Sequence, residues 1–206
     1  MLFNILVLIS LVVMMLALRT LVEVFPSLMA CLIRAKESIN LEASAQLSRS
    51  RTIVAFCLAA PFCLAVWHRG MYRPAFMDGL DENLCIGITF GVFIAYAVFR
   101  KLMELMIKNK IRNGKVYTVA CKTSLTFFSI LTLTLLAVGG IMSILDTPAE
   151  VVTSAMLWIS ASIYLVFILR KTQILISSAS FFAAFLYLCA LEFIPTGALV
   201  ASAIIF

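Results

Sequence analysis

The fold of this chain is decided by apolar runs such as Phe181–Ala203, which has the sequence FFAAFLYLCALEFIPTGALVASA and contains 23 residues. A helix needs about 20 predominantly apolar residues to cross the hydrocarbon core of a bilayer. The longer apolar stretch Ile174–Phe206 would form a helix of about 50 Å, which is too long for one upright crossing. We therefore predict a membrane span at Phe181–Ala203, preceded by a serine-containing approach at Ile174–Ser180.

The composition of the whole chain agrees with a membrane protein. Hydrophobic residues make up 64% of the 206 residues and charged residues make up 13%, and the mean hydropathy is +1.12. Soluble domains have about 45–50% apolar and about 25% charged residues. These values exclude a soluble globular enzyme, a secreted disulfide scaffold and a disordered tail. We expect one integral membrane domain that covers residues 1–206.

Six apolar runs are long enough to be membrane spans, although the second is marginally short. We predict spans near residues 2–18, 52–67, 83–99, 123–145, 151–169 and 181–203. The predicted fold class is therefore all-α, a polytopic membrane helix bundle of about six transmembrane helices. The first run lacks a preceding basic residue and a small-residue cleavage site, and Arg19 follows it. We expect it to be a membrane anchor and not a cleaved signal peptide.

Lysine and arginine in the connections predict the orientation, because these residues accumulate in cytoplasmic loops. The connections after the first, third and fifth spans carry five, seven and two Lys or Arg residues, whereas those after the second and fourth carry two and none. We expect six spans with both termini outside the cytoplasm. The net charge of +6 then predicts contact with anionic lipid at the cytoplasmic face and no nucleic-acid partner.

Two of the basic connections, Arg19–Arg51 and Arg100–Lys122, are long enough to have structure of their own. Both contain apolar residues among polar ones, a pattern typical of amphipathic helices that lie on a membrane surface. We expect such helices at the cytoplasmic face. The alternative is that these connections bind a cytoplasmic partner.

Glu192 is the one acidic residue inside a predicted span. A carboxylate at membrane depth is unfavourable, so an ionisable residue there is a functional candidate by default. We expect Glu192 to be mostly protonated and to hydrogen-bond a neighbouring span. The candidate partners are Thr132, Thr134, Ser160 and Ser162. Three roles stay open: helix packing, transport or coupling, and a position near the outer headgroups if the helix begins at Ile174.

Pro195 follows Glu192 closely and lacks a backbone N–H, which frees the carbonyl of Leu191. A kink beside a buried carboxyl group can form a hinge or a polar pocket. Proline is also an ordinary residue of membrane helices. Pro195 is therefore a second functional candidate, supported mainly by its position next to Glu192.

Small residues predict where helices approach each other closely. Gly87, Gly91 and Ala95 are spaced by four residues on the third span, which places them on one ridge. We expect this ridge to pack inside the bundle, and dimerisation is the alternative. Gly139 and Gly140 in the fourth span predict a flexible point or a contact notch.

The residue types that usually form metal or cofactor sites are sparse. His68 is the single histidine, and none of the six cysteines forms a Cys-x-x-Cys pair. A haem or zinc site needs further ligands, so we predict no metal and no cofactor. Catalytic motifs such as Gly-x-Ser-x-Gly and His-Glu-x-x-His are also absent from the sequence, and we predict that the protein is not an enzyme.

The motif LYLCALEFIP at residues 186–195 resembles the terminal motif of a bacterial family of multi-spanning membrane proteins in the Bacteroidota, catalogued as domain of unknown function 4271. The layout is similar too, with an apolar N-terminal span and then a proline, here Pro26, that leads into a basic amphipathic connection. This chain departs by lacking polar residues before its first span. The resemblance implies a bacterial inner-membrane protein without an assigned activity, and it includes Glu192 and Pro195 in the motif.

Two functions from different classes fit this sequence. The first is a non-enzymatic accessory or assembly component of a cell-envelope complex, with protein partners at its short outer loops and basic inner surface. The second is a small transporter or proton-coupled channel that uses Glu192. A lipid-modifying enzyme is a weaker third interpretation, because no catalytic pair of residues converges in the sequence.

Overall fold

The computed structural model describes residues 2–108, 114–177 and 181–205, and these residues contain no β-strand. The helices are α1 (Leu2–Ile33), α2 (Ala35–Ala43), α3 (Ala45–His68), α4 (Glu82–Lys108), α5 (Gly114–Ile144), α6 (Ala149–Ile176), α7 (Phe181–Leu188) and α8 (Ile194–Ile205). A 3-10 turn, η1 (Ala75–Met77), precedes α4, and a π-helical turn, η2 (Cys189–Phe193), joins α7 to α8.

Six of the helical segments are long and apolar enough to cross a membrane, which confirms the all-α multi-span fold. They are Phe3–Ile33, Ala45–His68, Glu82–Ile107, Val116–Ile144, Ala149–Ile176 and Phe181–Ala203. The last segment comprises α7, the π turn and most of α8. The protein is therefore a multi-pass membrane protein.

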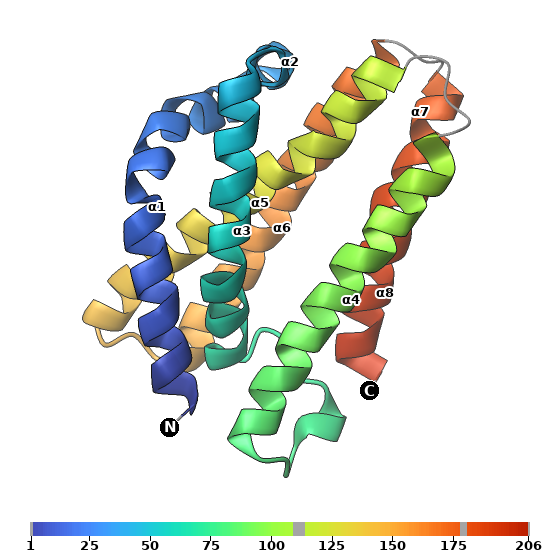
Figure 1. Cartoon of the computed structure of the whole chain (residues 1–206). Helices are drawn as coiled ribbons and strands as arrows, with labels where there is room; N and C mark the ends of the chain where they lie inside the picture. Colours follow the sequence, from blue (N-terminus) through green and yellow to red (C-terminus); the bar gives the residue numbers. More distant parts are fainter. Residues whose placement is uncertain (1, 109–113, 178–180, 206) are drawn as a thin grey trace.

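Figure 1 shows how the six segments are arranged. Helix α3 packs against both α1 and α5, and α5 packs against α6, while α4 lies beside α8. The start of α1 and the end of α8 lie at the same end of the bundle, which we call the terminal end. Helix α2 lies at the opposite end, which we call the α2 end (Figure 1).

The prediction of amphipathic surface helices in the two long basic connections is wrong for most of their length, because the flanking helices continue into them. Helix α1 continues through Pro26 to Ile33, because Val24 and Leu28 pack against Ile130 of α5 and are not free to lie on lipid. Helix α4 likewise continues to Lys108, and α5 begins at Gly114. The separate helix that remains is the nine-residue α2. Residues 109–113, which include Lys110 and Arg112, lie outside the described residues.

The predicted approach at Ile174–Ser180 is also partly wrong, because α6 extends to Ile176. Ile174 and Leu175 are buried in a cluster with Ala184 and Leu188 of α7 and with Ala120 of α5. This apolar packing holds the end of α6 in helical form beyond the predicted span. Residues 178–180 lie outside the described residues.

The glycine ridge does not pack inside the bundle. Gly87, Gly91 and Ala95 are exposed, and a Cβ atom added at either glycine would meet no atom within 4 Å. Gly139 is buried, and its added Cβ would lie 3.7 Å from Met156, whereas Gly140 is exposed. The prediction of packing through the ridge is therefore wrong, and dimerisation through it stays a prediction.

Candidate functional site

The π turn carries Glu192 and ends at Phe193, two residues before Pro195. The backbone N–H of Ile194 donates to the carbonyl of Cys189, five residues earlier, which widens the helix by one residue at this point. A proline removes a donor and crowds the preceding turn, and widened turns are one way in which membrane helices accommodate it. Single π turns occur frequently at functional sites.

Glu192 is completely buried and is bonded to two cations from two other helices. Its Oε1 atom accepts a hydrogen bond from Nη2 of Arg100 on α4 at 2.5 Å, and another from Nζ of Lys171 on α6. The Glu192 residue is 0% exposed, and the Lys171 and Arg100 side chains are 1% and 22% exposed. We call Arg100, Lys171 and Glu192 the charge triad.

Phe167 on α6 contacts both cations of the triad. Its ring centroid lies 5.8 Å from Cζ of Arg100 and 5.7 Å from Nζ of Lys171. Cations within about 6 Å of an aromatic ring are attracted by its electrons. The aromatic ring therefore partly replaces the water that both cations lose on burial.

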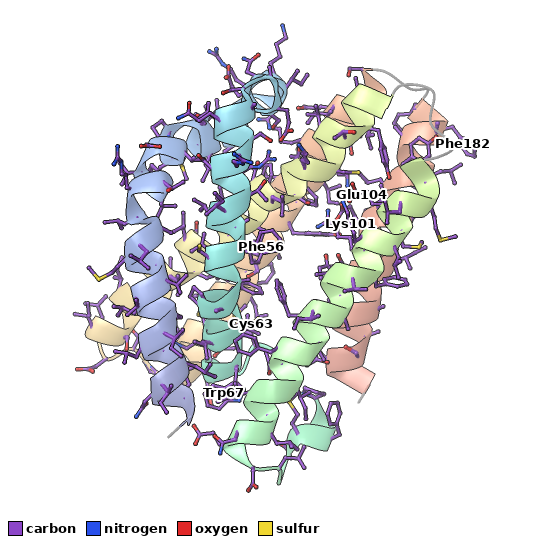
Figure 2. The ribbon with its side chains drawn as sticks, in the orientation of Figure 1. Phe56, Cys63, Trp67, Lys101, Glu104 and Phe182 are labelled. Atoms are coloured by element: carbon purple, nitrogen blue, oxygen red, sulfur yellow. The ribbon has the colours of Figure 1, made fainter. Side chains whose placement is uncertain are left out.

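The triad lies inside the membrane-length segments, toward the α2 end. Arg100 is eight residues before the end of α4 at Lys108, and Lys171 is five residues before the end of α6 at Ile176. At 1.5 Å per residue these positions are about 12 Å and about 8 Å from the helix ends. Lys101 and Glu104, which follow Arg100 on α4, lie in the half of the bundle nearer α2, far from Trp67 at the terminal end (Figure 2).

The predicted partners of Glu192 are wrong. Each hydroxyl proposed as a partner donates instead to a carbonyl four residues earlier in its own helix; these residues are Thr132, Thr134, Ser160 and Ser162. Glu192 itself is completely buried within the protein. Arg100 and Lys171 lie at the ends of apolar runs, in stretches that the sequence predicts to be connections, and their position does not separate them from the other basic residues there.

Polar groups with unused hydrogen-bonding capacity adjoin the triad. Oε2 of Glu192 and the hydroxyl of Tyr164 are buried without a hydrogen-bond partner. One helical turn from the triad toward the terminal end, the hydroxyls of Tyr96 and Thr196 lie 3.4 Å apart. The interface between α4, α6 and α8 is therefore polar along more than one turn.

A second carboxylate, that of Glu42 at the end of α2, also lies between two cations. Arg51 of α3 and Lys122 of α5 form ion pairs with it, the latter at 2.8 Å. Ser48 donates to the same carboxylate at 3.1 Å. Burial alone would favour the neutral acid, but the hydrogen bond from Lys122 and the charge of Arg51 hold the pKa of Glu42 below its ordinary value.

His68 lies at the terminal end, where its ring stacks on Phe3 with centroids 5.4 Å apart. It also lines a pocket of about 320 Å³ together with Trp67, Tyr72 and Glu82. Within residues 2–108, 114–177 and 181–205, no group of three or more His, Cys, Asp or Glu side chains is placed to hold a metal ion.

Comparison with known proteins identifies the family of the chain. The search of curated proteins and the search of solved structures gave no significant match. A family model described as a domain of unknown function (DUF4271) matches residues 3–202. This match covers nearly the whole described bundle, including every residue of the charge triad. The chain therefore belongs to the DUF4271 family.

Proposed function

We propose that the protein is a small non-enzymatic membrane transporter or channel in which protons are coupled to movement at Glu192. The observation that carries this proposal is the complete burial of Glu192 between Arg100 and Lys171 within membrane-length segments. Ionisable residues within membranes are rare and mark ion pathways and proton relays.

The triad is better suited to coupling than to stability alone. A buried ion pair is weak evidence for a stabilising role, because the loss of hydration on burial offsets the attraction between the charges. Three helices meet at this one carboxylate, and protonation of Glu192 removes the charge that both cations face. The contact between α4, α6 and the π turn then weakens in one step.

Proton entry into vesicles tests the proposal. Purified protein is reconstituted with a pH-sensitive dye inside, and a negative inside potential is imposed with valinomycin and a potassium gradient. Acidification is measured with and without a filtered small-molecule extract of the source cells outside. We expect vesicles with the parent protein to acidify faster than empty vesicles. Vesicles with Glu192→Gln should acidify like empty ones.

The matched control is Glu23→Gln, which removes the carboxylate of an exposed ion pair with Arg19 on α1. This variant should acidify like the parent protein. Melting and insertion of Glu192→Gln are measured in parallel, so that lost flux is not confused with lost protein. Parent protein that acidifies like empty vesicles in both conditions would overturn the proposal.

An accessory or assembly component of a cell-envelope complex is the second candidate function. The observation that favours it is the exposed ridge of Gly87, Gly91 and Ala95 on α4. Small residues at this spacing let the backbone of another helix approach closely. A partner helix in the same membrane fits such a ridge.

Isolation of the protein from native membranes tests this second function. The parent protein and Gly91→Leu are purified under mild conditions, and co-purified proteins are identified by mass spectrometry. A partner that accompanies the parent and is lost from Gly91→Leu supports an accessory role. Identical partner sets for both proteins would remove the ridge as its basis.

We also propose a bacterial inner-membrane location with both termini in the periplasm. The support is the concentration of Lys and Arg in the connections that lie at the α2 end, since such residues accumulate on the cytoplasmic side. Anionic lipid is the partner expected there. An origin in the Bacteroidota stays a prediction from the resemblance described above.

A further inference from the structure

The charge triad contains more positive than negative charge. Arg100 and Lys171 share one carboxylate, and both approach the same oxygen of Glu192. A second buried carboxylate within reach would be needed to balance them. Glu104, which lies one turn after Arg100 on α4, pairs with Lys101 on its own helix at 3.0 Å.

Protonation of Glu192 makes this imbalance larger, because two buried cations are then left without a counter-charge. An uncompensated charge in a low-dielectric region is strongly unfavourable. An anion that takes the place of the Glu192 carboxylate restores the single negative charge that both cations share. Binding of an anion therefore makes it more favourable for Glu192 to take up a proton. Protonation of Glu192 likewise makes it more favourable for the anion to bind.

We infer that the charge triad is the binding site for a small carboxylate anion, which replaces the Glu192 side chain on Arg100 and Lys171 when Glu192 is protonated. This inference rests on the proposed function and names its substrate class: the anion and the proton would cross together.

The geometry favours a carboxylate over other anions. The site already holds a carboxylate, and the planar guanidinium of Arg100 presents donors that match two carboxylate oxygens at once. Arg100 is the most exposed member of the triad, at 22%, so its side chain is the one that a ligand can reach. The buried hydroxyl of Tyr164, whose ring lies beside Phe167, adds a polar group next to the triad.

Several other polar and titratable groups face the triad, and all belong to helices packed against it. They are Tyr96 on α4, Cys121 on α5, and Tyr164 on α6, each of which interacts electrostatically with Arg100 or Glu192. None of these is an acid that ionises near neutral pH in its ordinary state. Glu192 is thus the carboxylate whose protonation changes the charge of the site.

The test is the melting temperature of the purified protein as sodium acetate replaces sodium chloride at constant ionic strength. Measurements at about pH 6 and about pH 8 keep acetate ionised, because carboxylic acids ionise near pH 4. A ligand that binds the folded protein raises its melting temperature. We expect acetate to raise it by about 2–4 °C at the lower pH and by less at the higher pH.

Two variants separate the parts of this inference. Glu192→Gln imitates the protonated state, so acetate should stabilise it equally at both pH values. Arg100→Gln should lose the response to acetate. The matched control is Arg19→Gln, which removes an exposed arginine and should respond like the parent. His68→Asn removes the histidine at the terminal end and should leave the pH dependence unchanged.

The inference is overturned if acetate and chloride act alike, if the acetate effect does not depend on pH, or if Arg100→Gln responds like the parent protein. These outcomes differ from failure of the proposed function. Proton entry that requires Glu192, without an acetate response, would leave the proposed function standing and remove only the substrate class. If Glu192→Gln fails to fold, the parent protein and Arg100→Gln still decide the result.

Discussion

Arg100 of α4 and Glu192 of the π turn lie 92 positions apart in the sequence, yet Nη2 of Arg100 is 2.5 Å from Oε1 of Glu192. Few residues of α4 are buried against the rest of the protein. This contact belongs to an interface that also includes the Tyr96–Thr196 pair and the packing of Met103 and Ile107 against the cluster that contains Leu191.

Glu192→Ala should destabilise the protein by about 3–5 kcal/mol, because it leaves Arg100 and Lys171 buried without a counter-charge. Glu192→Gln retains an acceptor and the side-chain shape, so its loss of stability should be smaller. The measurement is thermal unfolding in detergent. Equal melting of Glu192→Ala and the parent protein would contradict the importance of the triad for stability.

Lys171→Met should destabilise far less than Glu192→Ala, by about 1 kcal/mol or less, because Arg100 and Glu192 then remain as a balanced pair. In the double variant, Lys171→Met should recover part of the stability that Glu192→Ala loses. The measurement is a double-mutant cycle, in which the free energy of unfolding is compared among the parent, both single variants and the double variant. Simple additivity of the two losses would argue against charge imbalance.

Glu42 should make the stability dependent on pH in the acidic range. Its pKa is lowered in the folded protein, so its contribution is present above the ordinary glutamate pKa of about 4.3 and is lost as the pH falls through the lower folded value. The difference in melting temperature between the parent and Glu42→Gln should shrink as the pH is lowered from neutral. A difference that stays constant down to acidic pH would refute this.

Gly91→Leu and Gly139→Leu should behave oppositely. Gly91 is exposed and its added Cβ meets no atom, so leucine should leave stability unchanged or raise it by up to about 1 kcal/mol through helix propensity. Gly139 is buried beside Met156, so leucine there should cost about 1–3 kcal/mol through overpacking. Thermal unfolding of both variants measures these effects. A large loss of stability for Gly91→Leu would show that this face of α4 is in a contact.

Reporter fusions should place both termini in the same compartment. Alkaline phosphatase fused after the last residue should be active, and a fluorescent protein inserted at Ser44, between α2 and α3, should fluoresce. The reason is the basic charge of the connections at the α2 end. A fluorescent and phosphatase-inactive C-terminal fusion would refute the proposed orientation.

Much of the fold was predictable from the sequence, because apolar length alone determines where helices can cross a bilayer. Glu192 was likewise identifiable as the acid within a span. The partners of Glu192 were not predictable, because Arg100 and Lys171 lie at the ends of apolar runs. Positive charge at such positions also marks the cytoplasmic side. The helices extend past the hydrocarbon length and carry these two residues into the bundle.

The error at the glycine ridge has a different cause. A spacing of four residues shows that Gly87, Gly91 and Ala95 share one face of a helix, but it does not show which way that face points. In soluble proteins the apolar face would point to the core. In a membrane both faces of α4 are apolar, so the direction is set by the α4 residues that contact the bundle, among them Arg100, Tyr96 and Phe93.

The π turn also sets the rotation of the last span. Each residue advances an α-helix by about 100° and 1.5 Å, so the extra residue at Cys189–Phe193 fixes the angle of α7 relative to α8. If the widened turn moved along the helix by one position, the side chain of the residue it passed would rotate about the helix axis by about 100°. The helix itself would stay continuous. Glu192 lies within the widened turn, so such a step would move its carboxylate out from between Arg100 and Lys171. Both ends of the span would keep their positions.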